Sequence, residues 1–95
     1  MRRDLVLTAK FERAYRKFLR RDHGLQKRIE AVLHQMEEDI FSASLGTHKL
    51  SGTLAGLRAC ACGYDCRIVF AFEHDPDSNN EVIVLLDIGS HDEIY

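Results

Sequence analysis

The sequence has 95 residues, of which 45% are hydrophobic and 29% are charged, and its formal net charge at pH 7 is −2. This length and this apolar fraction predict one domain, residues 1–95, with a single core. No stretch approaches the roughly eighteen consecutive apolar residues of a membrane-spanning helix, and "LVL" at residues 5–7 is too short for the core of a signal peptide. We therefore expect a cytoplasmic protein with no membrane partner.

The first forty residues predict a short strand and two helices. "DLVLT" reads as the strand, and the hydroxyl of Thr8 can cap the helix that follows. This helix carries an apolar stripe at helical spacing, formed by Phe11, Ala14, Tyr15, Phe18 and Leu19. "DHG" interrupts the pattern at Gly24. A second helix then places apolar residues at Leu25, Ile29, Val32, Leu33, Met36 and Ile40. The two helices predict an αα-hairpin.

The predicted helices also concentrate positive charge. Residues 1–28 contain ten Lys and Arg and three Asp and Glu, which gives a net charge of +7. Residues 29–95 contain three Lys and Arg and twelve Asp and Glu, which gives a net charge of −9. So dense a basic segment can contact a polyanion or the acidic surface of a protein partner. A solvated helix face without a partner is the alternative.

The second half of the chain changes to the period of strands. "HKLSG", "GLRACA", "CRIVFAF" and "EVIVLLDI" read as four strands, and "DPDSNN" reads as a turn before the last of them. Both faces of "CRIVFAF" are mostly apolar, which favours a central strand covered on at least one side. The order β-α-α-β-β-β-β predicts an α+β fold, in which the helical hairpin packs on one face of a largely antiparallel sheet.

Three cysteines, Cys60, Cys62 and Cys66, lie within seven residues. Their odd number and crowding differ from a disulfide framework and favour reduced thiols that pack as small buried hydrophobic groups. A metal site is an alternative, but it would need a fourth ligand such as His74. A cysteine nucleophile is a further alternative, although no base lies beside any of the three in the sequence.

Polar residues at strand ends and turns form the richest candidate site: His48, Lys49, Arg58, Asp65, Arg67 and His91. Cleavage of RNA without a metal needs a base for the 2′-hydroxyl proton, an acid for the leaving 5′-oxygen, and a cation for the charged phosphorane. Histidine suits both proton transfers because its pKa lies near neutrality. Arg67, inside an apolar strand, either grips a phosphate or has a structural role, snorkelling to solvent or pairing with Asp65.

Three stretches carry a resemblance to a known family: "HKLSGTLAGLRAC", "GYDCRIVFAF" and the terminal "GSHDEIY". Together they resemble the RelE/ParE superfamily of bacterial toxins from type II toxin–antitoxin modules. Within it, they look most like the YafQ branch of RelE-like mRNA interferases. The resemblance covers the whole chain, and its most specific part is the ending, supported by the "HKLSG" strand.

The resemblance implies a helical hairpin on one side of a small antiparallel sheet and an RNA-facing surface on the other. It also implies cleavage of mRNA in the ribosomal A site without a metal or another cofactor, which inhibits translation. The implied partners are a cognate antitoxin, the mRNA in the A site, and operator DNA reached only through the toxin–antitoxin complex.

Residue by residue, the resemblance assigns four catalytic positions: His48, Asp65, Arg67 and His91. His91 would act as general acid or base with help from His48 and Asp65, and Arg67 would hold the phosphate. The expected RNA-binding residues are Lys49, Arg58 and Tyr95. Tyr95 occupies the position of a terminal aromatic residue that is usually Phe, and its ring would stack on a base.

Two departures from the family pattern keep other functions open. Ala61 stands where the YafQ branch has another catalytic histidine, and Cys66 stands where it has a tryptophan. The net acidity also differs from the usual basic charge of toxins that enter the A site. The alternatives are a degenerate toxin that only forms antitoxin and operator complexes, a ParE-like toxin that binds DNA gyrase, and an unrelated small α+β domain. The His/Asp set counts against gyrase binding, because such relatives generally lack it.

Overall fold

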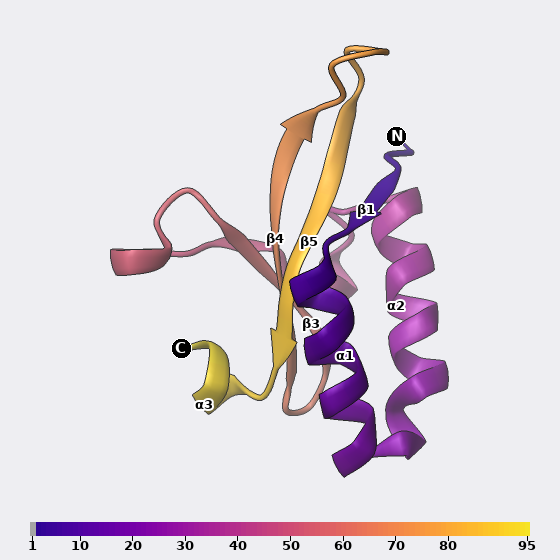
Figure 1. Ribbon diagram of the computed structural model, residues 1–95, viewed down its shortest axis with the longest axis vertical. Helices are drawn as coiled ribbons and strands as arrows, with labels where there is room; N and C mark the ends of the chain where they lie inside the picture. Colours follow the sequence, from indigo (N-terminus) through magenta and orange to yellow (C-terminus); the bar gives the residue numbers. More distant parts are fainter. Residues whose placement is uncertain (1) are drawn as a thin grey trace.

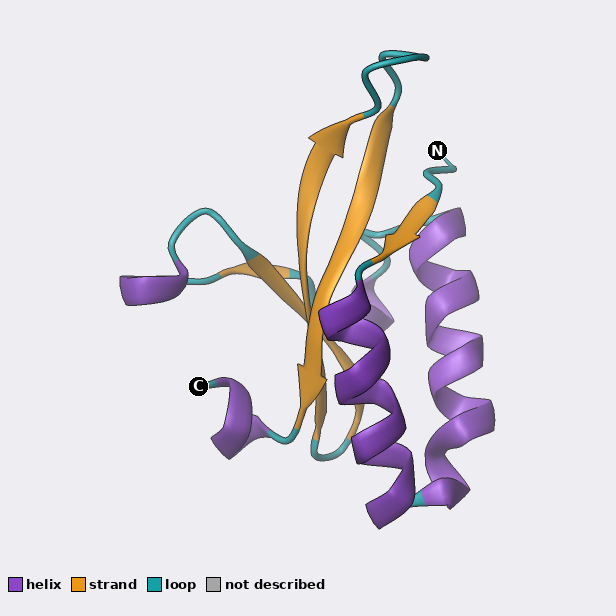
Figure 2. Ribbon diagram, in the orientation of Figure 1, coloured by secondary structure: helices purple, strands orange, loops and turns teal. Residues whose placement is uncertain are grey.

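The computed structural model describes residues 2–95, which form a five-stranded sheet with two long helices beside it (Figures 1 and 2). The strand order is β1-β5-β4-β3-β2, with β1 parallel to β5 and every other neighbouring pair antiparallel. The strands are β1 (Leu5–Leu7), β2 (His48–Lys49), β3 (Arg58–Gly63), β4 (Cys66–His74) and β5 (Glu81–Gly89). The predicted α+β class, the element order and the central position of β4 are confirmed.

The two long helices are α1 (Ala9–Arg21) and α2 (Gln26–Glu38), joined by a single 3-10 turn at His23–Leu25. Thr8 caps α1 as predicted, because its Oγ1 accepts a hydrogen bond from the Phe11 amide at 3.0 Å. The same hydroxyl donates to the Leu85 carbonyl at 2.8 Å, which fixes the start of α1 to β5. No helix within residues 2–95 has the length and apolar character that crossing a membrane requires.

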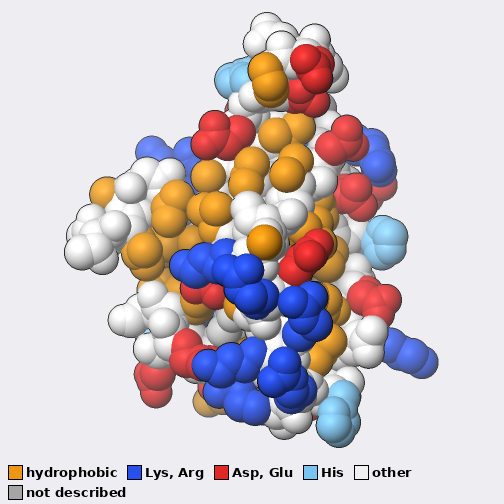
Figure 3. All heavy atoms as spheres, in the orientation of Figure 1, with side chains coloured by type: hydrophobic (Ala, Val, Ile, Leu, Met, Phe, Trp, Pro, Cys, Tyr) orange, Lys and Arg blue, Asp and Glu red, His pale blue; other side chains and the backbone are white. Residues whose placement is uncertain are grey.

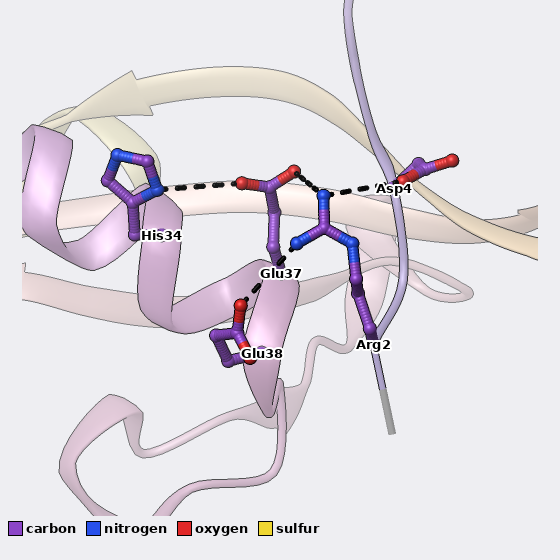
Figure 4. Close-up of polar contacts among 5 residues, drawn as sticks. All are labelled: Arg2, Asp4, His34, Glu37 and Glu38. Carbon is purple, nitrogen blue, oxygen red and sulfur yellow. Dashed lines mark hydrogen bonds and ion pairs between the residues drawn. The ribbon is translucent and has the colours of Figure 1, made fainter.

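Ion pairs attach the N-terminal segment to the end of α2. The Arg2 guanidinium lies 3.4 Å from a carboxylate oxygen of Glu37 and 3.4 Å from one of Glu38 (Figure 4). The Arg3 amide donates to the Glu37 carbonyl at 2.9 Å. These contacts hold β1 at the edge of the sheet beside α2.

The core lies between the helices and one face of the sheet. Phe11 and Phe18 of α1 and Ile29 and Met36 of α2 are buried there, as their predicted apolar stripes require. The sheet contributes every second residue of its central strands: Cys60, Cys62, Ile68, Phe70, Ile83 and Leu85. The intervening residues of β3 and β4 therefore face away from the two long helices.

Strand β2 is shorter than the predicted "HKLSG" strand. It spans only His48–Lys49, and the chain then enters a 3-10 turn at Gly52–Leu54. Gly52 has a φ of +66°, a left-handed conformation that glycine adopts without steric cost and that ends the extended run. The prediction was too long because alternation of residues does not reveal where pairing with a neighbouring strand stops.

The prediction of three reduced cysteines is wrong, because Cys62 and Cys66 form a disulfide that joins β3 to β4 beside their tight turn. Spacing in the sequence did not show this, but the hairpin brings their Cα atoms to 4.9 Å. Cys60 remains a free, buried thiol, as expected. The alternative metal site also fails, since His74 ends β4 about 26 Å along the strand from Cys66. Within residues 2–95, no three His, Cys, Asp or Glu side chains converge in a metal-binding arrangement.

Candidate active site

The face of the sheet away from α1 and α2 gathers three of the residues singled out in the sequence. His48 pairs with Ala59 in the β2–β3 register, and Ala61 pairs with Arg67 in the β3–β4 register. Directly paired residues share a face of a sheet, and so do residues two apart on one strand. His48, Ala61 and Arg67 therefore lie on one face, opposite to Cys60 and the helical core.

A short C-terminal helix, α3 (His91–Ile94), turns back over this end of the sheet (Figure 1). Ser90 and Glu93 form a capping box: the Ser90 hydroxyl accepts from the Glu93 amide at 3.3 Å, and the Glu93 carboxylate accepts from the Ser90 amide at 2.9 Å. Gly89 makes the sharp return possible, because a Cβ there would lie only 3.2 Å from Glu93 Oε1 and 3.3 Å from Glu93 Cβ. This return carries His91 and Tyr95 toward His48.

Tyr95 and His48 meet directly across the site. The Tyr95 hydroxyl lies 3.0 Å from Nε2 of His48, and Nδ1 of His48 lies 3.0 Å from the Gly46 carbonyl. A carbonyl can only accept, so the neutral imidazole carries its proton on Nδ1 and donates it to Gly46. Nε2 then has a free lone pair that accepts from the Tyr95 hydroxyl. The hydrogen bond to the Gly46 carbonyl thus fixes the orientation of the His48 ring, and Nε2 is the basic nitrogen that the ring presents to the site.

His91 lies beside the same tyrosine. The centroids of the two rings are 4.7 Å apart in an edge-on arrangement. The His91 backbone amide donates to Oδ1 of Asp65 at 2.9 Å, which ties the start of α3 to the β3–β4 turn. His48 comes from a segment distant from His91 and Tyr95, and the three residues form one group. Asp65 contacts this group through the backbone of His91.

Arg67 does not form the ion pair with Asp65 that the sequence offered as one alternative. Its Nη1 donates to the carbonyls of Cys66 at 2.8 Å and Gly63 at 3.0 Å, so it braces the β3–β4 turn and does not pair with Asp65. A weaker contact at 3.5 Å reaches the carbonyl of Tyr64. All three contacts use Nη1, and Nε and Nη2 make no hydrogen bond within residues 2–95.

Arg58 does not lie in this group, whereas Lys49 lines a groove beside His48 and Tyr95. Lys49 and Arg58 pair with each other in the β2–β3 register, on the opposite face of the sheet from His48. The Arg58 guanidinium carbon stacks 5.0 Å from the centroid of the Phe72 ring, and Phe72 packs against the helical core. Their RNA-binding role stays a prediction.

A groove of about 450 Å³ runs beside His48 and Tyr95. One wall is the segment from His48 to Leu54, and the other is formed by Ile94 and Tyr95. The Tyr95 side chain is 47% exposed, so one side of its ring is available to a ligand. The groove can therefore offer a base, a phenol and an aromatic surface to a bound molecule, and His91 lies beside Tyr95 without lining the groove itself.

Two residues that support α3 were missed in the sequence. Arg21 Nη2 of α1 donates to Glu93 Oε1 at 2.7 Å, across 72 positions of the chain. The Arg21 guanidinium and the Ser90 amide together lower the pKa of Glu93 to about 2. The S-x-x-E pattern at 90–93 could have indicated the capping box, whereas no sequence signal indicates the partner on α1.

The fold and the sequence both match known toxins. Over residues 3–95 the sequence fits the profile of a family described as the bacterial toxin of type II toxin–antitoxin systems, YafQ. No curated protein sequence matches the chain. YafQ from E. coli superposes with a TM-score of 0.76 at 12% identity, covering 98% of each chain. A chain of the E. coli DinJ–YafQ toxin–antitoxin complex superposes with a TM-score of 0.74 at 12% identity, covering 100% of this chain and 99% of that chain. The YoeB/ParE toxin from Agrobacterium tumefaciens superposes with a TM-score of 0.70 at 17% identity, covering 93% of this chain and 98% of that chain.

At these identities the superpositions establish the fold, and the family profile, which spans nearly the whole chain, establishes membership. The resemblance seen in the sequence is thereby confirmed. The chain belongs to the YafQ family of bacterial type II toxin–antitoxin toxins, a branch of the RelE-like superfamily.

Proposed function

We propose that this toxin is a metal-independent endoribonuclease that cleaves mRNA in the ribosomal A site, in the cytoplasm, and so inhibits translation. The observation that carries the proposal is the meeting of His48, His91 and Tyr95 at one end of the sheet, with the Tyr95 hydroxyl 3.0 Å from Nε2 of His48. Imidazoles can serve as both the base and the acid that RNA cleavage without a metal needs.

In the proposed reaction, Nε2 of His48 takes the proton of a ribose 2′-hydroxyl, and the freed oxygen attacks the adjacent phosphorus. The bond from phosphorus to the 5′-oxygen breaks, and His91, in its protonated form, gives that oxygen a proton. The products are a 2′,3′-cyclic phosphate and a 5′-hydroxyl. The Nε and Nη2 groups of Arg67 are free to bind the charged phosphate oxygens, and Asp65 holds His91 in place through its amide.

Tyr95 has two roles in this proposal. Its hydroxyl keeps the His48 imidazole oriented until the substrate enters, and its half-exposed ring stacks on a base of the bound mRNA. Lys49 and Arg58, on the other face of β2 and β3, would then contact RNA outside the cleavage site.

The basic face of α1, defined here as Arg13, Arg16 and Lys17, would bind ribosomal RNA. All three side chains are exposed, and within residues 2–95 none of them forms an ion pair. Figure 3 shows Lys and Arg side chains gathered on the lower part of the face along which α1 runs in Figure 1. Such a surface attracts the phosphate backbone without reading its sequence.

A cognate antitoxin is the expected protein partner. The E. coli relative has been solved in a toxin–antitoxin complex with DinJ, which supports a corresponding complex for this chain. Operator DNA would be reached only through that complex.

Primer extension on an mRNA translated in a purified ribosome system tests the activity. Wild-type toxin should cut the message only when ribosomes are present, and toxin treated with a chelator and dialysed before the assay should cut it equally well. His48→Ala and His91→Ala should each lower the cleavage rate by about 10² to 10⁴, the usual contribution of one acid or base. His34→Ala, an exposed histidine of α2 outside the site, is the matched control and should cleave like the wild type.

Equal activity of His91→Ala and wild type would refute the assigned roles, and cleavage without ribosomes would refute the A-site mechanism. Ala61 favours a second candidate, since the half-buried position that faces Arg67 has no titratable side chain. This candidate is a toxin that no longer cleaves and acts only by binding. It would be supported by an antitoxin complex together with unaltered messages and normal translation.

A further inference from the structure

We propose that Arg21, at the C-terminal end of α1, is a positioning residue for the active site: through Glu93 it sets where α3 presents His91 and Tyr95 to His48. This inference rests on the proposed function and extends it to a residue outside the RNA-contacting group. Its basis is that α3 is attached to the rest of the molecule mainly by polar contacts.

Burial supplies little attachment for α3. None of its residues is buried, and Ile94 is the one that is half-buried, packing on Gly89. A four-residue helix has no stability of its own in water. The position of His91 and Tyr95 therefore depends on the hydrogen bonds at the start of α3.

Those bonds converge on Asp65 and Glu93. Asp65 accepts from the His91 amide at 2.9 Å, which fixes one point of α3 to the β3–β4 turn. Glu93 Oε1 accepts from both the Ser90 amide at 2.9 Å and Arg21 at 2.7 Å. Two attachment points on different elements define the direction of a short helix, whereas one point leaves it free to swing.

Arg21 is well anchored for this purpose. Its guanidinium carbon lies 5.6 Å from the centroid of the Phe18 ring, and Phe18 is part of the buried core. The low pKa of Glu93, about 2, which Arg21 and the Ser90 amide cause, keeps the carboxylate ionised at any pH at which the toxin works. The contact is thus a charged bridge from α1 to the C-terminal helix α3.

The contact matters for activity through geometry. Exposed ion pairs add little to the stability of a fold, so the loss of Arg21 should not unfold the protein. Displacement of a reacting group by about 1 Å can nevertheless slow a reaction by roughly 10²-fold. The expected signature is a lower kcat in a protein of nearly unchanged thermal stability.

The test compares Arg21→Ala with Arg20→Ala, which removes the same charge from the neighbouring position. Within residues 2–95, Arg20 forms no hydrogen bond or ion pair with α3, so its loss reports the effect of charge alone. In the ribosome assay, kcat of Arg21→Ala should be about tenfold below that of Arg20→Ala, with KM values within about twofold of each other. Arg21→Lys, which keeps the charge, should recover part of the loss.

A second readout needs no catalysis. In the free toxin, the rings of His48 and Tyr95 have centroids 6.0 Å apart and should give nuclear Overhauser effects between their protons. These signals should weaken in Arg21→Ala and persist in Arg20→Ala. Glu93→Gln keeps an acceptor for the Ser90 amide but loses the charge, and it is the second variant should Arg21→Ala fold poorly. The nuclear Overhauser effects between His48 and Tyr95 should weaken in this variant too.

Unchanged ring contacts in both Arg21→Ala and Glu93→Gln would overturn the inference, and so would a kcat of Arg21→Ala equal to that of Arg20→Ala. A wild-type toxin that cleaves no message but whose ring contacts depend on Arg21 would refute the proposed function and leave the positioning role in place. The two proposals can thus fail separately.

Discussion

Among single residues, Tyr95 differs from the family pattern by one hydroxyl group, and this hydroxyl contacts His48. The resemblance leads one to expect Phe at this position and a histidine at position 61, where this chain has Ala61. The structure gives the phenol a bond to Nε2 of His48 that a Phe could not make. The hydroxyl thus supplies a polar group to a site that lacks one histidine.

Two substitutions separate the hydroxyl of Tyr95 from its ring. Tyr95→Phe should lower the cleavage rate about two- to tenfold, the value of one ordinary hydrogen bond. Tyr95→Ala should cost about a further ten- to hundredfold, because it also removes a surface on which a base stacks. Cleavage rates on ribosomes measure both effects. A Tyr95→Phe rate equal to that of the wild type would leave the hydroxyl without a function.

Among the elements, the β3–β4 hairpin is the support on which the site rests. The Cys62–Cys66 disulfide closes it on the core side, and Arg67 braces its turn through the carbonyls of Gly63 and Cys66. The same turn presents Asp65 to α3. A loose hairpin would therefore disturb both the fold and the position of His91.

The disulfide predicts a measurable stability. Opening a closed loop of this size should cost roughly 2 kcal/mol on the chain-entropy account, which lowers Tm by about 10 °C in a domain of this length. Thermal unfolding with and without a reductant measures the change. Cys60→Ala, which keeps the disulfide, is the control and should respond to reductant as the wild type does.

Thiol titration gives an independent check of the disulfide. Without reductant, the denatured chain should expose the single free thiol of Cys60. In the native protein this thiol should react slowly at neutral pH, because burial raises its pKa to about 12 and keeps it protonated. Three reactive thiols in the denatured, unreduced chain would contradict the disulfide.

In the whole molecule, charge is divided between the two halves of the chain. Residues 1–28 carry +7 and residues 29–95 carry −9, so the small net charge of −2 hides a strongly basic helical face. A division of this kind orients the molecule in the field of a polyanion. The proposed contact between the basic face of α1 and ribosomal RNA is therefore compatible with the net acidity of the protein.

Salt dependence tests this role of the basic face. The double variant Arg16→Ala with Lys17→Ala should weaken ribosome binding and lower the slope of log affinity against log salt by roughly one per cation removed. Filter binding over a series of salt concentrations measures the slope. Arg2→Ala is the control, since its guanidinium already pairs with Glu37 and Glu38 and should contribute little to binding. An unchanged slope in the double variant would place the ribosome contact elsewhere.

The sequence by itself determined the features that depend on neighbours along the chain. The helical spacing of Phe11 and Phe18, the Thr8 cap and the alternation in β4 all have local physical causes, and the structure confirms them. The family motifs supplied the residues that the site brings together: His48, His91 and Tyr95.

Only the tertiary structure decided what depends on distant segments. The pairing of β1 with β5, the early end of β2, the Cys62–Cys66 disulfide and the bridge from Arg21 to Glu93 join parts that no local pattern connects. The same holds for the bond between Tyr95 and His48, 47 positions apart. Helix and strand periodicity records which face of an element is buried, whereas the register and the contacts between elements follow from packing the whole chain.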